Sequence, residues 1–331
     1  MKRGLAICLV FLSLLFPGCR KQEKPQKTTI FAMDTVMDLT IYGEEELLTK
    51  AEMLVREMES RLSVTATESE LSEWNRGERE DLSPETASLI ARALAVCART
   101  NGALDITVYP LVRAWGFTTG NYRVPTEAER LDLLSSVDYQ SVSVDGTTVR
   151  KNIAGIEMDL GAVAKGELGD RLAQMLREAG VQSALLNLGG NVVAIGSKPN
   201  GDPWRVAITD PNDNGYLGYL QVSDASVVTS GGYERNFTAN GITYHHILNP
   251  ATGLPADSGL LSVTIVGTDG LLCDAMSTAC FVMGLEKSIA QWKAHRDFEA
   301  VFLTVEGEIY LTEGLESSFT AVDRKVQVIR A

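Results

Sequence analysis

An aspartate and a threonine in the last quarter of the chain have the spacing of a metal-binding pair. Asp274 and Thr278 stand four positions apart in the segment Asp-Ala-Met-Ser-Thr. On a helix, residues i and i+4 project from one face, so a carboxylate and a hydroxyl oxygen converge there. Hard oxygen ligands suit Mg²⁺ or Ca²⁺ and do not suit zinc or copper. Taken alone, the same spacing also occurs where Asp and Thr simply cap or solvate a helix.

Residues 159–166 form a second chemical segment, which reads Asp-Leu-Gly-Ala-Val-Ala-Lys-Gly. It lies between an expected short strand and a helix. Gly161 lets the backbone approach a ligand closely, and the amides that open the next helix point at an anion. Lys165 places a point charge on a phosphate or holds an acidic side chain. The small residues are equally what a tight strand-to-helix crossing needs.

Two adjacent histidines precede a turn. His245 and His246 come shortly before Asn249-Pro250, a pair that starts turns. If residues 244–248 form a strand, the two side chains face opposite sides. One histidine then enters a cleft while the other packs or meets solvent. A structural role for both is the alternative.

Two glycine pairs, Gly189-Gly190 and Gly231-Gly232, each follow an expected strand. Turned amide groups at such places can cradle phosphate oxygens. Plain hairpin turns account for the same residues, and neither pair fits a Walker or dinucleotide-binding glycine pattern.

These segments need a sheet and helices to position them. Apolar residues alternate over 37–41, and one helical face is apolar over 47–62. Ser83-Pro84 begins a helix that ends near Asn101-Gly102, and another helix ends at Gly180. Further helices are expected at 271–283 and 286–295, a hairpin turn at 306–307, and strands at 184–188, 192–195, 205–209, 219–222, 226–229, 242–248 and 261–266. Because the strands come in consecutive runs, the fold class is α+β with antiparallel sheets flanked by helices.

The N-terminus is typical of an exported lipoprotein. Lys2 and Arg3 precede an apolar run over 5–16 that is too short to span a bilayer, and Gly18-Cys19 follows. Residues 1–18 are therefore predicted to be a signal peptide, with diacylglycerol on Cys19 as the membrane anchor. An ordinary secretory signal is the alternative. Residues 19–28 are predicted to be a polar tether and 29–331 the folded domain.

The charge balance and the cysteines exclude several classes of protein. A net charge of −13 repels phosphate backbones, so no nucleic-acid partner is expected. An anionic ligand would need local amides, a lysine or a metal to overcome that background. Cys273 and Cys280 are about 10 Å apart along a helix, too far for a disulfide, and no zinc pattern is present.

Taken together and in this order, the segments resemble the ApbE family of FAD:protein FMN transferases. The resemblance runs from about Phe31 to the last strands. It rests on Met33-Asp34-Thr35, residues 70–75, 102–107, 159–166 and 187–191, Thr229-Ser230-Gly231, residues 246–253 with Pro255, and residues 274–278. The implied fold is ApbE-like, with T-fold-like antiparallel sheets.

The resemblance also implies ligands and roles. FAD, as substrate, would lie in a cleft with Mg²⁺ beside its diphosphate. The metal ligands would be the side chains of Asp274 and Thr278 and the backbone carbonyl of Ala162. The FAD contacts would come from Met33, Asn75, Ala103, Leu104, Asp105, Asp159, Lys165, Gly190 and His246.

The implied reaction attaches FMN to a threonine of another protein. The threonine hydroxyl attacks the FMN-side phosphorus of FAD, and AMP leaves. Positioning and charge neutralisation dominate such phosphoryl transfers. His246 and Asp159 are both candidates for the base that accepts the threonine proton, and the sequence does not choose between them. The implied acceptors are membrane redox subunits, and the protein would work outside the cytoplasm, on the periplasmic face of the inner membrane where two membranes exist.

Two departures from the family pattern keep alternatives open. Many members have glycine where Asp34 stands, and some have a flavin-stacking tyrosine where Asn75 stands. Asparagine there predicts looser FAD binding and Mg²⁺-dependent hydrolysis of FAD to FMN and AMP, so a FAD pyrophosphatase is the first alternative. A non-catalytic FAD-binding lipoprotein is the second, and an adhesion module has no support beyond the strands and the anchor.

Overall fold

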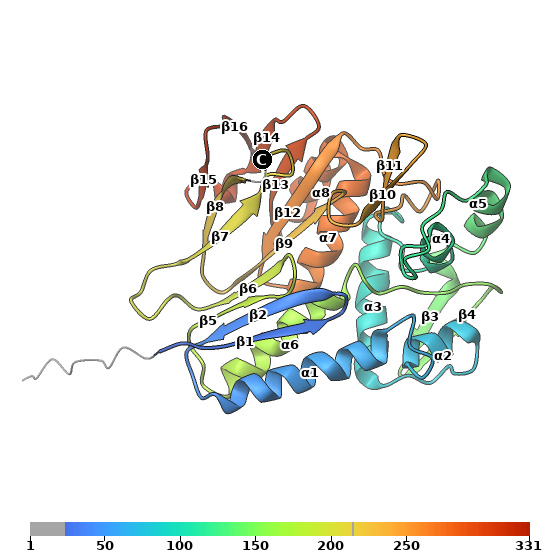
Figure 1. The fold of residues 1–331 in the computed structure, drawn as a ribbon, viewed down its shortest axis with the longest axis horizontal. Coiled ribbons are helices and arrows are strands. Elements are labelled where there is room, and N and C mark those ends of the chain that lie inside the picture. Colours follow the sequence, from blue (N-terminus) through green and yellow to red (C-terminus); the bar gives the residue numbers. More distant parts are fainter. Residues whose placement is uncertain (1–23, 214) are drawn as a thin grey trace, which may run out of the picture.

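A nine-stranded sheet forms the centre of the computed structural model, which describes residues 24–213 and 215–331 (Figure 1). In spatial order its strands are β1 (Gln26–Ala32), β2 (Thr35–Ile41), β5 (Ala184–Asn187), β6 (Asn191–Ile195), β9 (Ala225–Gly231), β12 (Leu260–Gly267), β13 (Glu299–Thr304), β14 (Ile309–Thr312) and β16 (Val326–Ile329). All neighbours are antiparallel except β14 and β16. The predicted α+β class is confirmed.

Helices cover one face of this sheet. They are α1 (Glu46–Leu62), α6 (Ala164–Glu178) and α7 (Gly270–Met283), with α3 (Pro84–Arg99) and α8 (Leu285–His295) packed against α7. Apolar side chains of α1 and α6 join those of β1, β2, β5 and β6 in one core, and α3, α7 and β12 form another. A small sheet of β7 (Trp204–Thr209), β8 (Tyr216–Val222) and β15 (Phe319–Ala321) contributes to a third core with β6, β9, β12, β13 and β14. The molecule is thus layered as helices, large sheet and small sheet.

Shorter elements lie at the other end of the molecule (Figure 1). They are α2 (Glu70–Arg76), α4 (Tyr109–Trp115), α5 (Glu127–Leu134), the 3₁₀ turn Tyr139–Ser141 and the hairpins β3 (Val142–Asp145)–β4 (Thr148–Lys151) and β10 (Asn236–Ala239)–β11 (Ile242–His245). A second 3₁₀ turn, Glu313–Leu315, lies between β14 and β15. Aromatic rings connect α4 to the β10–β11 hairpin: the Trp115 centroid lies 5.2 Å from that of Tyr244 and 6.3 Å from that of Phe237. This satellite core stands opposite the large sheet.

Local signals explain the helix boundaries. Ser83 caps α3 by accepting the Thr86 N–H, and Pro84 occupies the first turn, as predicted. Gly180 adopts φ +86° after α6, a conformation that favours glycine. The helices predicted from periodicity and the turn near residues 306–307 are confirmed.

Two predicted boundaries were wrong. Residues 26–28, predicted as tether, pair with β2, since Gln26 lies opposite Ile41. The strand predicted over 242–248 ends at His245, because its only partner β10 begins opposite it at Asn236. His246 therefore belongs to the following loop.

The described part of the chain adds two simple findings. No helix there is long and apolar enough to cross a membrane. Cys97, Cys273 and Cys280 are buried free thiols, and Cys273 and Cys280 both lie on α7, the helix on which their spacing was predicted to prevent a disulfide. The predicted signal peptide and Cys19 lie outside the described residues.

Candidate active site

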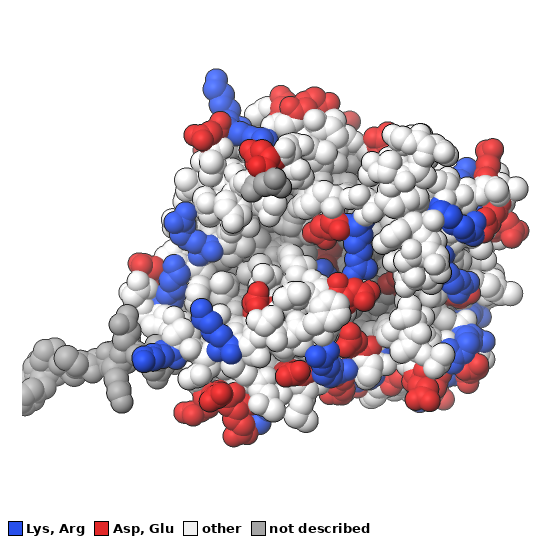
Figure 2. Space-filling view, in the orientation of Figure 1, with Lys and Arg blue, Asp and Glu red and all other residues white. Residues whose placement is uncertain are grey.

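A cavity of about 760 Å³ opens between the edge of the large sheet and the satellite core. Its walls come from the β1–β2 turn, the end of α1, residues 103–108, α4, the entrance to α6, residues 189–191, the end of β9, residues 233–235, residues 246–250 and α7. Figure 2 shows this face of the molecule hollowed, with acidic and basic side chains near one another.

The cavity brings together nearly all the residues predicted for the site. Those that line it are Met33, Ala103, Leu104, Asp105, Asp159, Ala162, Lys165, Gly190, His246, Asp274 and Thr278. Asn75 is the exception. Its amide donates to the Met158 carbonyl at 2.9 Å and accepts the Met158 N–H at 2.7 Å, which holds α2 against a neighbouring segment. The predicted contact of Asn75 with FAD therefore has no basis in its position.

Asp274 and Thr278 project from α7, as their spacing predicts. Asp269 caps this helix by accepting the Leu272 N–H at 2.9 Å. The buried Asp274 carboxylate accepts the N–H of Gly166, in the first turn of α6, at 2.8 Å. Burial raises the pKa of Asp274, and the positive charge of Lys165 opposes that shift. The first-turn amide of α6, which could have bound an anionic ligand, thus binds the Asp274 carboxylate of the protein itself.

Gly166 permits this close contact of α6 with α7. A Cβ at that position would lie 2.8 Å from Asp274 Cβ and 2.7 Å from the Gly270 carbonyl carbon, well inside ordinary contact. On the next turn of α7, Thr278 Oγ1 lies 3.3 Å from Ser230 Oγ, which is also 2.7 Å from Ser277 Oγ. Ser230 ends β9 beside the helix and joins the hydroxyl cluster.

Lys165 is held by the glycine pair that precedes β6. Its Nζ donates to the Gly189 carbonyl at 3.1 Å. The amides of Gly189 and Gly190 both donate to Asn187 Oδ1, at 3.2 and 3.4 Å. These two amides, predicted as a phosphate cradle, are therefore engaged with a side chain. The pair instead supplies the carbonyl that positions Lys165.

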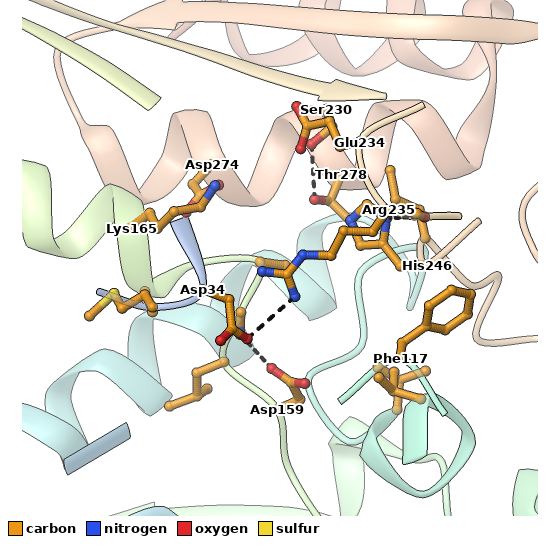
Figure 3. Close-up of a pocket in the computed structure, with 18 of the residues that line it drawn as sticks. Asp34, Phe117, Asp159, Lys165, Ser230, Glu234, Arg235, His246, Asp274 and Thr278 are labelled. Carbon is orange, nitrogen blue, oxygen red and sulfur yellow. Dashed lines mark hydrogen bonds and ion pairs between the residues drawn. The ribbon is translucent and has the colours of Figure 1, made fainter. Parts of the chain in front are cut away.

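His246 faces the cavity from the loop after β11 (Figure 3). Its backbone N–H donates to the Arg235 carbonyl at 3.0 Å, and its Nδ1 lies 3.2 Å from the same oxygen. Donation by Nδ1 leaves Nε2 as an acceptor. Burial lowers the pKa of His246 to about 4, so the ring is neutral near pH 7. His245 turns away and lies 3.0 Å from the Ala256 carbonyl through Nε2.

Two predicted carboxylates have different surroundings. Asp159 Oδ1 accepts the Gly161 N–H at 2.6 Å, and burial raises the pKa of Asp159. Asp105 accepts from the N–H and hydroxyl of Thr107 at 2.8 and 2.6 Å and from the Tyr139 N–H at 3.1 Å. Burial raises the pKa of Asp105 as well. Asp105 organises its loop, whereas Asp159 keeps one oxygen free of hydrogen bonds to the described residues.

The β1–β2 turn covers one side of the cavity. Met33 and Asp34 both have positive φ, 49° and 56°, as a two-residue hairpin turn requires. The Met33 N–H donates to Glu59 Oε1 of α1 at 2.7 Å. Behind the turn, Thr35 packs directly on Gly189, where a Cβ would overlap the threonine side chain.

Acidic groups outnumber fixed cations in the described lining. The carboxylates are Asp34, Glu59, Asp105, Asp159, Glu234 and Asp274, and the fixed cations are Lys165 and Arg235. Such a cavity attracts cations, and an anionic ligand in it needs direct neutralisation. Glu59, Glu234 and Arg235 were not predicted from the sequence. The last two directly follow the Thr229–Tyr233 segment, which was the available signal.

The oxygen atoms of the cavity wall near α7 can coordinate a hard cation only if a bound ligand supplies the remaining coordination positions. The side chains of Asp274 and Thr278 supply one carboxylate and one hydroxyl to this wall, and Ala162 also lines the cavity. Among the described residues, no group of three or more His, Cys, Asp or Glu could hold a metal ion. Mg²⁺ is commonly held by one or two carboxylates together with substrate phosphates, and the wall has room for that arrangement.

Comparison with known proteins identifies this architecture. The model of the ApbE family matches residues 33–302. The chain belongs to the ApbE family. It is 34% identical over 301 residues to the FAD:protein FMN transferase of Klebsiella pneumoniae strain 342, covering 88% of this chain and 93% of that protein. The Treponema pallidum FAD:protein FMN transferase is 35% identical over 256 residues, covering 72% and 70%.

Solved ApbE structures share the fold. The ApbE protein of Thermotoga maritima superposes with a TM-score of 0.82 at 32% identity, covering 88% of this chain and 98% of that one. The flavin transferase ApbE of Vibrio cholerae gives 0.80 at 26% identity, covering 89% and 99%. The resemblance to the ApbE family seen in the sequence is confirmed.

Proposed function

We propose that this protein transfers FMN from FAD to a threonine hydroxyl of another protein and releases AMP. The observation that carries the proposal is the convergence of three groups in one cavity: the oxygen donors of α7, the cation Lys165 and the neutral His246. The names of its ApbE relatives support the same reaction. FAD is the substrate, and the acceptor is a protein.

Mg²⁺ is the proposed metal. Asp274, Thr278 and the Ala162 carbonyl would hold it, and when bound it neutralises charge on the phosphate oxygens of FAD. Lys165 adds a fixed positive charge that the Gly189 carbonyl keeps in place. The carboxylates around the cavity make this neutralisation necessary.

We propose His246 as the base. Its Nδ1 is occupied by the Arg235 carbonyl, so Nε2 is the nitrogen that accepts the threonine proton. The threonine oxygen then bonds to the FMN-side phosphorus, the bond from that phosphorus to the bridging oxygen breaks, and AMP leaves. The negative diphosphate favours the protonated ring and thereby raises the basicity of a histidine whose pKa is low in the empty cavity. Asp159 is the competing base, since it also faces the cavity.

Membrane attachment through Cys19 is also proposed. The sequence before β1 supports it, and β1 begins at Gln26, seven residues beyond Cys19. A seven-residue link extends at most about 25 Å, so the cavity would stay near the membrane surface and near redox subunits embedded in it. Replacing Cys19 by alanine should move the protein from the membrane fraction to the soluble one.

A single experiment tests the reaction. Residues 20–331 are incubated with FAD and Mg²⁺, with and without a flavin-accepting subunit, while AMP and protein-bound flavin are followed. Acceptor mass rising by one FMN, with loss of labelling in EDTA and in Asp274→Ala, is the expected result. AMP and free FMN without labelling would favour the pyrophosphatase, and bound FAD without AMP would favour the binding protein. Asn75 lies outside the cavity lining, so its position gives no support for faster hydrolysis of FAD.

A further inference from the structure

The backbone of Arg235 is held by hydrogen bonds, whereas its guanidinium makes only a long ion pair. Its carbonyl oxygen is bound by both the N–H and the Nδ1 of His246. Its guanidinium reaches across the cavity from the His246 side toward Asp34 and Asp159 (Figure 3). Among the described residues, the guanidinium makes no hydrogen bond, and its one ion pair is with Asp34 at 3.8 Å.

The ion pair with Asp34 is weak by its geometry. The distance exceeds a hydrogen bond, and the side chains of Arg235 and Asp34 are 43% and 81% exposed. Exposed pairs of this kind contribute little, and a better partner displaces them. Asp34 stands in a left-handed turn position that favours glycine, at φ 56°. Its carboxylate therefore lies over the cavity mouth, where it meets Arg235.

Arg235 is also the cation most available to a phosphate. The other fixed cation in the lining, Lys165, already donates to Gly189. A guanidinium offers two parallel N–H groups to phosphate oxygens and holds them bidentately. Burial has the largest effect on the pKa of each candidate base, raising that of Asp159 and lowering that of His246, and the positive charge of Arg235 lowers both.

We propose that Arg235 binds the diphosphate of FAD, and that Asp34 holds the guanidinium over the cavity until the diphosphate replaces it. This inference rests on the proposed function and adds a specificity residue to it. A flavin without phosphates gains nothing from Arg235. The Asp34 carboxylate competes with the diphosphate for the guanidinium. Arg235 therefore selects the dinucleotide over riboflavin, and Asp34 reduces that preference.

Equilibrium binding tests the proposal without turnover. FAD and riboflavin are titrated by flavin fluorescence against the full chain in detergent with EDTA. The variants are Arg235→Gln, Arg235→Lys, Asp34→Asn and the double variant Asp34→Asn/Arg235→Gln. Arg330→Gln is the control, because Arg330 is an exposed arginine paired with Glu316 and outside the cavity lining.

The expected pattern is specific to the phosphates. Arg235→Gln should weaken FAD binding about 10- to 100-fold, the worth of charged hydrogen bonds, and change riboflavin binding less than about twofold. Arg235→Lys should fall between Arg235→Gln and the parent. Asp34→Asn should tighten FAD binding about two- to fivefold, and this gain should vanish in the double variant.

Other outcomes overturn the proposal. Equal weakening of FAD and riboflavin by Arg235→Gln would mean that Arg235 only shapes the cavity. A gain from Asp34→Asn that persists in the double variant would mean that Asp34 repels the phosphates directly. The parent protein is also titrated with Mg²⁺ in place of EDTA. A parent that binds FAD only with Mg²⁺ would overturn this inference alone, and one that binds neither flavin under either condition would refute the proposed function as well.

Discussion

Replacing Gly166 by alanine should separate the effect of cavity geometry from that of stability. The new Cβ would lie 2.7 Å from the Gly270 carbonyl carbon and 2.8 Å from Asp274 Cβ, where ordinary contact begins at 3.4 Å. The α7 backbone would have to retreat by about 0.7 Å or more. Asp274 and Thr278 move with it, because both project from α7.

The two consequences differ in size. Overpacking lowers the free energy of unfolding by about 1–3 kcal/mol. The better helix propensity of alanine raises it by about 1 kcal/mol. A net loss of about 2 kcal/mol or less lowers Tm by only a few degrees in a chain of this length. Misplacement of catalytic groups by about 1 Å costs on the order of 100-fold in rate. The transfer rate should therefore fall far more than the stability.

Gly169→Ala is the matched control on the same helix. Its Cβ would meet the Val193 Cγ2 at 2.7 Å and the Leu188 Cδ1 at 3.5 Å, both ends of side chains that can rotate. It should keep the transfer rate within about twofold, with Tm near that of the parent. Melting curves and AMP release at several Mg²⁺ concentrations give both quantities. A Gly166→Ala protein with the parent's rate would refute the claim that the α6–α7 contact positions the site.

Three further predictions follow from individual residues. Because burial lowers the pKa of His246 to about 4, kcat/KM for FAD should stay level from pH 7 to about pH 5; a fall centred near pH 6.5 would contradict this. Burial raises the pKa of Asp170 from 3.8 to about 6, so the folded state holds this proton more tightly than the unfolded chain. The stabilising effect of the protonated Asp170 is complete below about pH 4 and is lost as the pH rises through about 6. Asp170→Asn should remove the resulting decline of the urea midpoint with pH. Parallel curves of urea midpoint against pH for the parent and the variant would exclude a contribution from Asp170. Gly189→Ala should destabilise the protein by about 1–3 kcal/mol more than Gly190→Ala. Both positions have positive φ, but only at Gly189 would the added Cβ crowd Thr35. Equal urea midpoints for the two variants would show that Thr35 can move away at no cost in stability.

The common face of Asp274 and Thr278 could be predicted because its signal is local. Asp274 and Thr278 share a helix, and helical spacing alone fixes their common face. Strands β2, β5, β6, β9 and β12 of the large sheet and the helices that cover it were predictable for the same reason, since periodicity and capping residues lie within each element. The resemblance to a family then placed Met33, Asp159 and His246 at one site, which no local pattern does.

The errors lie where partners distant in the chain decide the outcome. Asn75 was predicted to contact FAD, but its amide bonds to Met158, 83 residues away. For the amide groups of Gly189 and Gly190, the sequence left a phosphate cradle and a plain turn open, and Asn187 accepts both amides. In the first case the backbone of Met158, and in the second the side chain of Asn187, takes the hydrogen bonds that the sequence left open.

The sheet order also has a consequence for how the chain is made. The hairpin of β1 and β2 can form early, yet the next strand of the sheet, β5, begins only at Ala184. At about 5–20 residues per second, synthesis takes roughly 7–30 seconds to pass from the end of β2 to the end of β5. Throughout that interval the apolar face of Met37, Leu39 and Ile41, fully buried in the native protein, has no sheet to join. The hairpin that later covers the cavity therefore spends this interval without its neighbouring strand.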